Sequence, residues 1–161
     1  MNPASPVLPA DATLGPGVDE VIWAKDQPQY FPLPSLKLPL DARPGVVLTR
    51  WELTDEEKEA IATGGMFMLT IWASLDVQRA QLLIAKPDEA LAAVTKFLAT
   101  GNGIEPSREP VISGGDDTSS TFFEPTDKER LAFLDEEPPS VYLWIWLLGP
   151  YLQPLSLEVM S

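Results

Sequence analysis

The sequence predicts an α+β fold, mainly antiparallel sheet with short helices. We expect two similar strand–helix–hairpin units packed together, preceded by an extended, proline-rich N-terminal arm. Three observations predict this: short apolar runs between turn residues, two helix starts with the same capping pattern, and prolines concentrated near the N-terminus. We therefore expect an arm over residues 1–40 and one α+β domain over residues 41–161.

The arm is predicted from its prolines and its apolar side chains. Residues 1–40 contain eight of the 17 prolines. Proline fixes φ and favours extended geometry in the residue before it, so we expect no regular helix here, only a short strand at Glu20–Lys25. Tyr30, Phe31 and Leu33 are expected to pack on an apolar surface. That surface belongs either to the same chain or to a neighbouring subunit, and a proline-motif ligand for an adaptor domain is a third interpretation.

The first unit begins with a β-branched run that predicts a strand at Val46–Glu52. Thr54 and Glu57 then form a capping box, which starts a short helix that ends at a pair of glycines. Two further strands, at residues 66–72 and 77–85, are expected to pair as a hairpin.

Between the units we expect a helix and a long connection. The helix is predicted from about Asp88 to Thr100, because Leu91, Val94 and Leu98 form an apolar stripe at helical spacing. Residues 101–120 are rich in glycine, proline and serine, which predicts a loop or linker.

The second unit starts with a short strand and a second capping box, formed by Thr126 and Glu129. The chain is then expected to close with a hairpin. Its strands are Val141–Leu148 and Tyr151–Val159, and its turn is Gly149-Pro150.

An internal similarity relates the two units. The stretch WELTDEEKEAI aligns with FFEPTDKERLAF, which places the capping boxes 72 positions apart, and residues 69–72 align with residues 143–146. We therefore predict pseudo-repeats over about residues 47–85 and 119–159. Each unit would have a hydrophobic sheet face that it cannot bury alone, so the two are expected to pack against each other.

The Val141–Leu148 strand is apolar on both faces, so we expect it to be central and covered on both sides, or to meet a partner. Its aliphatic face is expected to form the core between the units. Its aromatic face can be covered by the arm or the 88–100 helix, or by another subunit. We expect Trp144 or Trp146 to contact the arm or another subunit rather than water, since tryptophan suits interfaces.

The composition excludes much chemistry. The chain has no cysteine and no histidine, so thiolate and histidine metal sites and histidine general bases cannot be built. A net charge of -13 disfavours nucleic acid and anionic membranes as partners. No signal peptide or span of about 20 apolar residues is visible, which predicts a soluble protein made in the cytoplasm.

Acidic clusters are the remaining candidates for chemistry. Asp116 and Asp117 lack the spacing of a calcium loop and fit a solvated loop. The run at Asp55–Glu57 suits a helix start, whereas Asp135–Glu137 follows a helix end, where a partner's basic surface is conceivable. We therefore predict no catalytic, cofactor-binding or metal-binding residue, and no enzyme.

One resemblance bears on function. The segments DEVIWAKDQPQYFPLPSLKLPL, GVVLTRWELTDEEKEAIATGG and YLQPLSLEV resemble small uncharacterised proteins of tailed bacteriophages and prophages. Those proteins share a pattern of KDQPEY-PLP, R-W-L-T and a closing LQPL. The match covers about residues 19–65 and 140–159, and the pattern is split across both units here.

Together with the apolar arm, the acidic charge and the duplicated core, the resemblance predicts a non-enzymatic virion component, namely a capsid decoration (cement) or head accessory protein. The expected partners are other virion proteins, such as the major capsid protein or like subunits, in a homo-oligomer or a large assembly. The alternative is a small phage protein that binds and modulates a host protein. The predicted interaction residues are Tyr30, Phe31, Leu33, Trp144 and Trp146.

Overall fold

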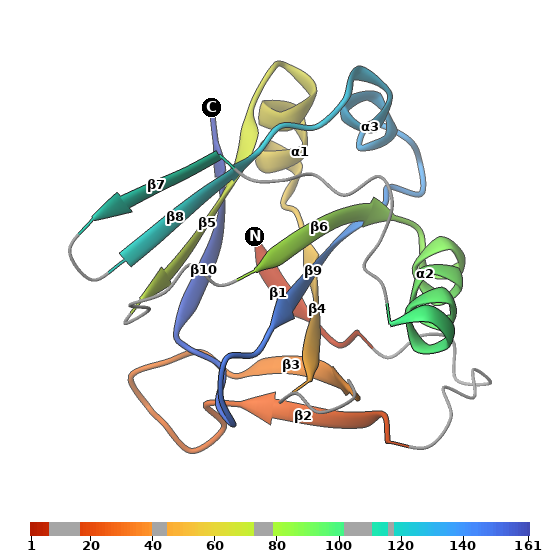
Figure 1. Ribbon diagram of the computed structural model, residues 1–161. Coiled ribbons are helices and arrows are strands. Elements are labelled where there is room, and N and C mark those ends of the chain that lie inside the picture. The colour runs from red at the N-terminus through yellow and green to blue at the C-terminus, as the bar shows by residue number, and fades with distance from the viewer. Residues whose placement is uncertain (7–16, 40–44, 73–78, 102–110, 116–117) are drawn as a thin grey trace.

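The computed structural model describes residues 1–6, 17–39, 45–72, 79–101, 111–115 and 118–161 (Figure 1). The described chain is mainly antiparallel sheet with a few short helices, which confirms the predicted α+β class. The strands are β1 (Asn2–Ala4), β2 (Asp19–Trp23), β3 (Leu33–Leu38), β4 (Val46–Glu52), β5 (Met66–Trp72), β6 (Ala80–Ala85), β7 (Val111–Gly115), β8 (Thr118–Phe123), β9 (Ser140–Trp146) and β10 (Leu155–Met160). The helices are α1 (Asp55–Ala62), α2 (Pro87–Thr100) and α3 (Asp127–Ala132).

The strands form two antiparallel sheets. We call sheet A the one with the order β2-β3-β4-β9-β6, in which β1 also pairs with β4. Sheet B has the order β10-β5-β8-β7. In Figure 1, sheet B lies on the left, α2 lies on the right beside β6, and α1 and α3 lie together at the top.

The inner core lies between the two sheets. Alternate side chains of β4, β5, β6, β8, β9 and β10 meet there, because strand residues point to opposite faces in turn. Ile61 of α1 and Phe133, at the end of α3, close one side of this core and are 0% and 2% exposed. Large strand residues buried in it include Trp51, Phe67, Leu69, Phe123, Leu143 and Ile145.

An outer core lies between sheet A and α2. The helix buries Ala90, Val94 and Phe97, which are spaced for one helix face, against the sheet. Both faces of β9 are therefore covered, and every residue of this strand is buried. This confirms that the strand is central, and its aliphatic residues do lie in the core between the sheets. The sheet residues of the outer core are Leu36, Leu38, Val46, Leu48, Ala85, Tyr142, Trp144 and Trp146.

Both predicted capping boxes are present. At α1, the Thr54 hydroxyl accepts a hydrogen bond from the Glu57 N–H (3.3 Å), and the Glu57 carboxylate accepts one from the Thr54 N–H (2.8 Å). At α3, Thr126 and Glu129 repeat the arrangement at 3.4 and 2.7 Å. These local patterns fix the starts of the two helices that face each other at the top of the molecule.

The two halves have the same order of elements but do not contain hairpins. In each half a strand and a helix are followed by two strands, β5 and β6 or β9 and β10. The predicted hairpins are wrong, because β5 and β10 belong to sheet B whereas β6 and β9 belong to sheet A. Each half thus contributes strands to both sheets, since only then are the apolar faces of both halves enclosed.

The pairing registers of the two halves correspond as well. Sheet A contains the order β4-β9-β6, and sheet B contains the matching order β8-β5-β10. Thr49 pairs with Leu143 in sheet A, and Thr121 pairs with Leu69 in sheet B. Those four residues are related by the same offsets that align the two units in sequence. Equivalent strands therefore occupy equivalent places in the two sheets.

Two further expectations are corrected. The described residues of the N-terminal segment contain no helix, and the strand predicted at Glu20–Lys25 is present as β2 (Asp19–Trp23). The segment is more regular than the predicted arm, however, because β1 and β3 are also strands of sheet A. The strands form because Leu33, Leu36 and Leu38 can be buried beside β4. Residues 101–120 were expected to be a loop, yet β7 and the start of β8 lie within them. Backbone pairing with β8 holds β7 in place despite its glycines.

Candidate protein-interaction surfaces

The β2–β3 connection presents two of the predicted interaction residues. The Gln27 N–H donates to the Ala24 carbonyl and the Tyr30 N–H donates to the Gln27 carbonyl, both at 3.1 Å. These turns leave Tyr30 44% exposed and Phe31 91% exposed. Leu33 begins β3 and packs into the inner core instead. Within this chain, Tyr30 and Phe31 therefore do not pack on an apolar surface as expected, whereas Leu33 does.

The β9–β10 connection presents two more large apolar side chains. Leu147 is buried, and its N–H donates to the Gly45 carbonyl (3.0 Å), which anchors the start of the connection. Beyond it, Leu148 is 60% exposed and Tyr151 is 74% exposed. From the sequence, Leu148 and Tyr151 were expected in the two strands of a hairpin, with Gly149-Pro150 as its turn, but β9 ends at Trp146 and β10 begins at Leu155. The available signal was that apolar residues flank Gly149-Pro150, where polar residues are usual.

Trp144 and Trp146 are buried inside the chain, not on a surface. Trp144 is 0% exposed and its ring centre lies 5.5 Å from that of Phe97 in α2. Trp146 lies 6.4 Å from the same ring, and the Arg79 guanidinium stacks 4.1 Å from the Trp146 ring centre. The 88–100 helix is thus the cover for this face. The same outer core contains Leu36 and Leu38 from the segment predicted as the arm. Neither indole is open to a partner in this structure.

An open groove lies between α1 and the end of α3. Asp55 and Glu59 line it from one side, and Asp135 and Glu136 line it from the other. Lys58 lies in the same groove but pairs with Asp55 at 2.9 Å, and this hydrogen bond and charge lower the Asp55 pKa. The structure thus brings together two acidic runs that lie about 80 residues apart in sequence. The groove has the charge to attract a basic surface.

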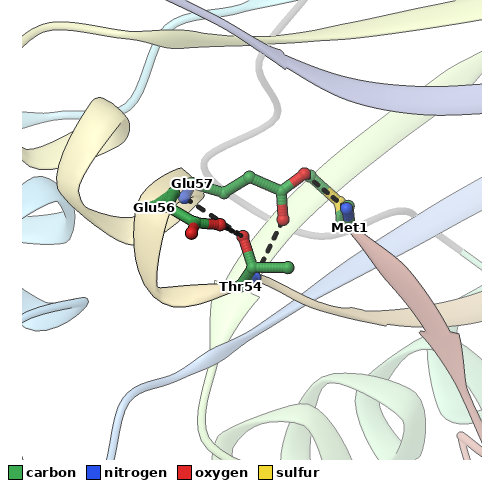
Figure 2. Close-up of polar contacts among 4 residues, drawn as sticks. All are labelled: Met1, Thr54, Glu56 and Glu57. Carbon is green, nitrogen blue, oxygen red and sulfur yellow. Dashed lines mark hydrogen bonds and ion pairs between the residues drawn. The ribbon is translucent and has the colours of Figure 1, made fainter.

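The N-terminal amine is fixed at the start of α1, as Figure 2 shows. The Met1 amine pairs with one carboxylate oxygen of Glu57, whose other oxygen accepts from the Thr54 N–H. Burial would raise the pKa of Glu57, but the hydrogen bonds from the amine and Thr54, and the amine's charge, lower it below its ordinary value of 4.5. One carboxylate thus caps α1 and holds β1.

Arg130 joins the two halves in the buried region between α1 and α3. The residue is 9% exposed, and its side chain donates hydrogen bonds to the Ile61 carbonyl (2.8 Å) and the Gly65 carbonyl. It also lies 3.6 Å from the Glu124 carboxylate. The guanidinium therefore satisfies carbonyl groups at the C-terminal end of α1, where a positive charge is favoured.

No group of three or more acidic residues in the described ranges is arranged to hold a metal ion. Asp116 and Asp117 lie outside the described residues. No described helix has the length and apolar character needed to cross a membrane. Among the described side chains, the exposed apolar loops and the acidic groove are thus the candidate sites, and both are suited to binding a protein.

Comparisons with protein-family models, curated proteins and solved structures found no match to this chain. The geometry of the chain itself is therefore the basis for the functional argument.

Proposed function

We propose that this chain is a non-enzymatic component of a bacteriophage particle, namely a capsid decoration (cement) or head accessory protein. It is made in the host cytoplasm and binds other virion proteins, the major capsid protein or like subunits. The observation that carries the proposal is the exposure of Phe31, at 91%, on a turn that is held by backbone hydrogen bonds. A large aromatic side chain in water favours association, because burying it stabilises a complex.

The second loop supports the same proposal. Leu148 and Tyr151 add exposed apolar area at another connection, and aromatic residues are enriched where proteins bind one another. The net charge of -13 favours a partner whose surface is less acidic than this chain. The phage resemblance supplies the biological setting, since the segment with Tyr30 and Phe31 is one of those that carry it.

We also infer that the chain contains a duplicated unit over about residues 47–85 and 119–159. Equal element order, matching strand orders and equivalent registers support this inference. A crystal structure tests it: equivalent Cα atoms of β4, α1 and β5 should superpose on those of β8, α3 and β9. A helix or strand in a different place would overturn it.

The function is tested on purified particles. Mass spectrometry should find abundant peptides of this chain in the virion, and particles lacking the chain should bind it when it is added back. Replacing Phe31 and Tyr151 by serine should weaken this binding at least tenfold. Leu131→Ser is the matched control, because Leu131 is 64% exposed on α3, away from both loops. Its binding should equal that of the natural chain.

The alternative is a phage protein that binds and modulates a host protein. The acidic groove between α1 and α3 is the observation that favours it, because four carboxylates there can attract a basic surface. Absence of the chain from purified particles would contradict the virion proposal. Salt-sensitive binding to a host protein, lost on changing Asp135 and Glu136 to asparagine and glutamine, would then support the alternative.

A further inference from the structure

The outer faces of the two sheets occupy equivalent places, but they differ in whether a described helix covers them. The outer face of sheet A is covered by α2. The equivalent face of sheet B is open, and in Figure 1 none of the described helices lies over it. We call it the open face. Its residues are Met66, Met68, Thr70, Trp72, Ser120, Phe122, Ser156, Glu158 and Met160, the side chains that alternate with the buried ones of β5, β8 and β10.

Trp72 is the most informative residue of the open face. By the sequence offset and the strand register it is the counterpart of Trp146. Trp146 is 7% exposed because Phe97 of α2 packs edge-on to its ring, whereas Trp72 is 43% exposed. A tryptophan thus stands at the same place on both sheets, and of the described helices one, α2, covers Trp146 and none covers Trp72.

The composition of the open face also differs from an ordinary solvated surface. Glu158 is its single charged side chain, although 22% of the chain is charged. Three methionines, one phenylalanine and one tryptophan lie among its small hydroxyl residues. Depletion of charge with enrichment in methionine and aromatic residues is typical of protein interfaces.

We propose that the open face binds an amphipathic helix of a partner protein, with an apolar residue of that helix packed on Trp72 as Phe97 packs on Trp146. The open face is suited to a helix, because the equivalent face of sheet A packs against α2. That helix contributes Ala90, Val94 and Phe97, which lie four and three positions apart. A helix of 14 residues is about 21 Å long and about 10 Å wide, which matches strands of six residues at about 20 Å. The polar residues Thr70 and Ser120 let this face tolerate water, so the partner can leave.

The net charge of this chain restricts the kind of partner helix further. The acidic chain attracts a helix whose polar flanks are basic. A second copy fits less well, because two chains of charge -13 would bring two copies of Glu158 into one interface.

A photo-crosslinking amino acid at position 72 tests the inference in cells that make the full-length chain. The crosslinked peptide is identified by mass spectrometry, and circular dichroism checks that the labelled chain is folded. We expect one dominant peptide from another protein, with apolar residues at helical spacing and basic flanks. The matched control is the same label at Ile22, which is 44% exposed on β2 of sheet A.

The identified segment is then made as a synthetic peptide. Its dissociation constant should rise at least tenfold with Trp72→Glu and stay unchanged with Leu131→Glu. A crosslink to a second copy, a peptide without helical spacing, or a yield no higher than at position 22 would each overturn the inference. The inference does not depend on the proposed function, because the open face is tested with variants of Trp72 and the two loops with variants of Phe31 and Tyr151.

Discussion

The two sheets contain the same strand order and pairing register but differ in the side chains of their outer faces. Sheet A presents Trp144 at the place where sheet B presents Thr70, and Leu48 where sheet B presents Ser120. The first face is mostly apolar, with Gln81 beside Trp144 and Arg50 beside Tyr142, and its apolar residues are buried under α2, whereas the second is mixed and open. Equal strand order and register therefore do not decide whether a face becomes core. The side chains at a few equivalent positions decide it.

The largest expected effect comes from breaking the covered face. Phe97→Ala removes the ring that packs on both Trp144 and Trp146 and leaves a cavity under α2. We expect the free energy of unfolding to fall by about 3–5 kcal/mol, as for other buried aromatic residues. Urea unfolding measures it. A loss below about 1 kcal/mol would mean that α2 is not an integral cover of sheet A.

The second-largest effect on stability is expected from the comparison between α3 and α1. Arg130 in α3 is buried and donates to two carbonyl groups, whereas Lys58, its counterpart in α1, pairs on the surface with Asp55. Arg130→Met should lower the free energy of unfolding by about 2–3 kcal/mol, because buried carbonyl groups lose a charged donor. Lys58→Met should leave the melting temperature unchanged within error. Equal losses in the two variants would contradict the assigned role of Arg130.

Some parts of the structure could be predicted from the sequence. The capping boxes at Thr54 and Thr126 were predictable, because the pattern and its hydrogen bonds lie within four residues. The strand at 141–148 and the core role of its aliphatic face were also predictable, since alternation fixes which residues share a face.

Strand partners were not predictable in the same way. Two consecutive strands have the same sequence pattern whether they pair with each other as a hairpin or belong to different sheets. Which pairing forms depends on the apolar faces that the rest of the fold leaves to be buried. β7 was missed because VISGG has weak strand propensity and is held by pairing with β8. The exposure of Phe31 was not predictable either, since an apolar residue in a proline-rich segment has the same sequence signature whether it packs in cis or faces water.

A third, smaller effect separates the two capping boxes. Glu57→Gln disrupts the pair with the Met1 amine and weakens the cap of α1, which should lower the free energy of unfolding by about 1 kcal/mol. Glu129→Gln changes the equivalent carboxylate of α3 and leaves the amine untouched. The difference between the two variants measures the contribution of the amine.

The ion pair between Glu57 and the Met1 amine predicts that the free energy of unfolding depends on pH. The pKa of Glu57 is lower in the folded chain than its ordinary value of 4.5, so its contribution to stability is fully present above that value. It is lost as the pH falls through the folded pKa, because the unfolded chain then binds the proton more readily. Denaturant unfolding between roughly pH 5 and 3 should show a steeper loss for the natural chain than for Glu57→Gln. Parallel curves would rule out this linkage.

The smallest effect on stability is expected at the open face, and it sharpens the comparison most. Trp72→Ser removes a side chain that is already 43% exposed and is covered by none of the described helices, so the free energy of unfolding should change by about 1 kcal/mol or less. Its counterpart change, Trp146→Ser, removes a ring packed between Phe97 and Arg79 and should have a severalfold larger effect. Urea unfolding of the two variants compares equivalent positions directly. Equal losses would show that Trp72 is already part of the core of this chain, and a face that is core already has no room for a partner.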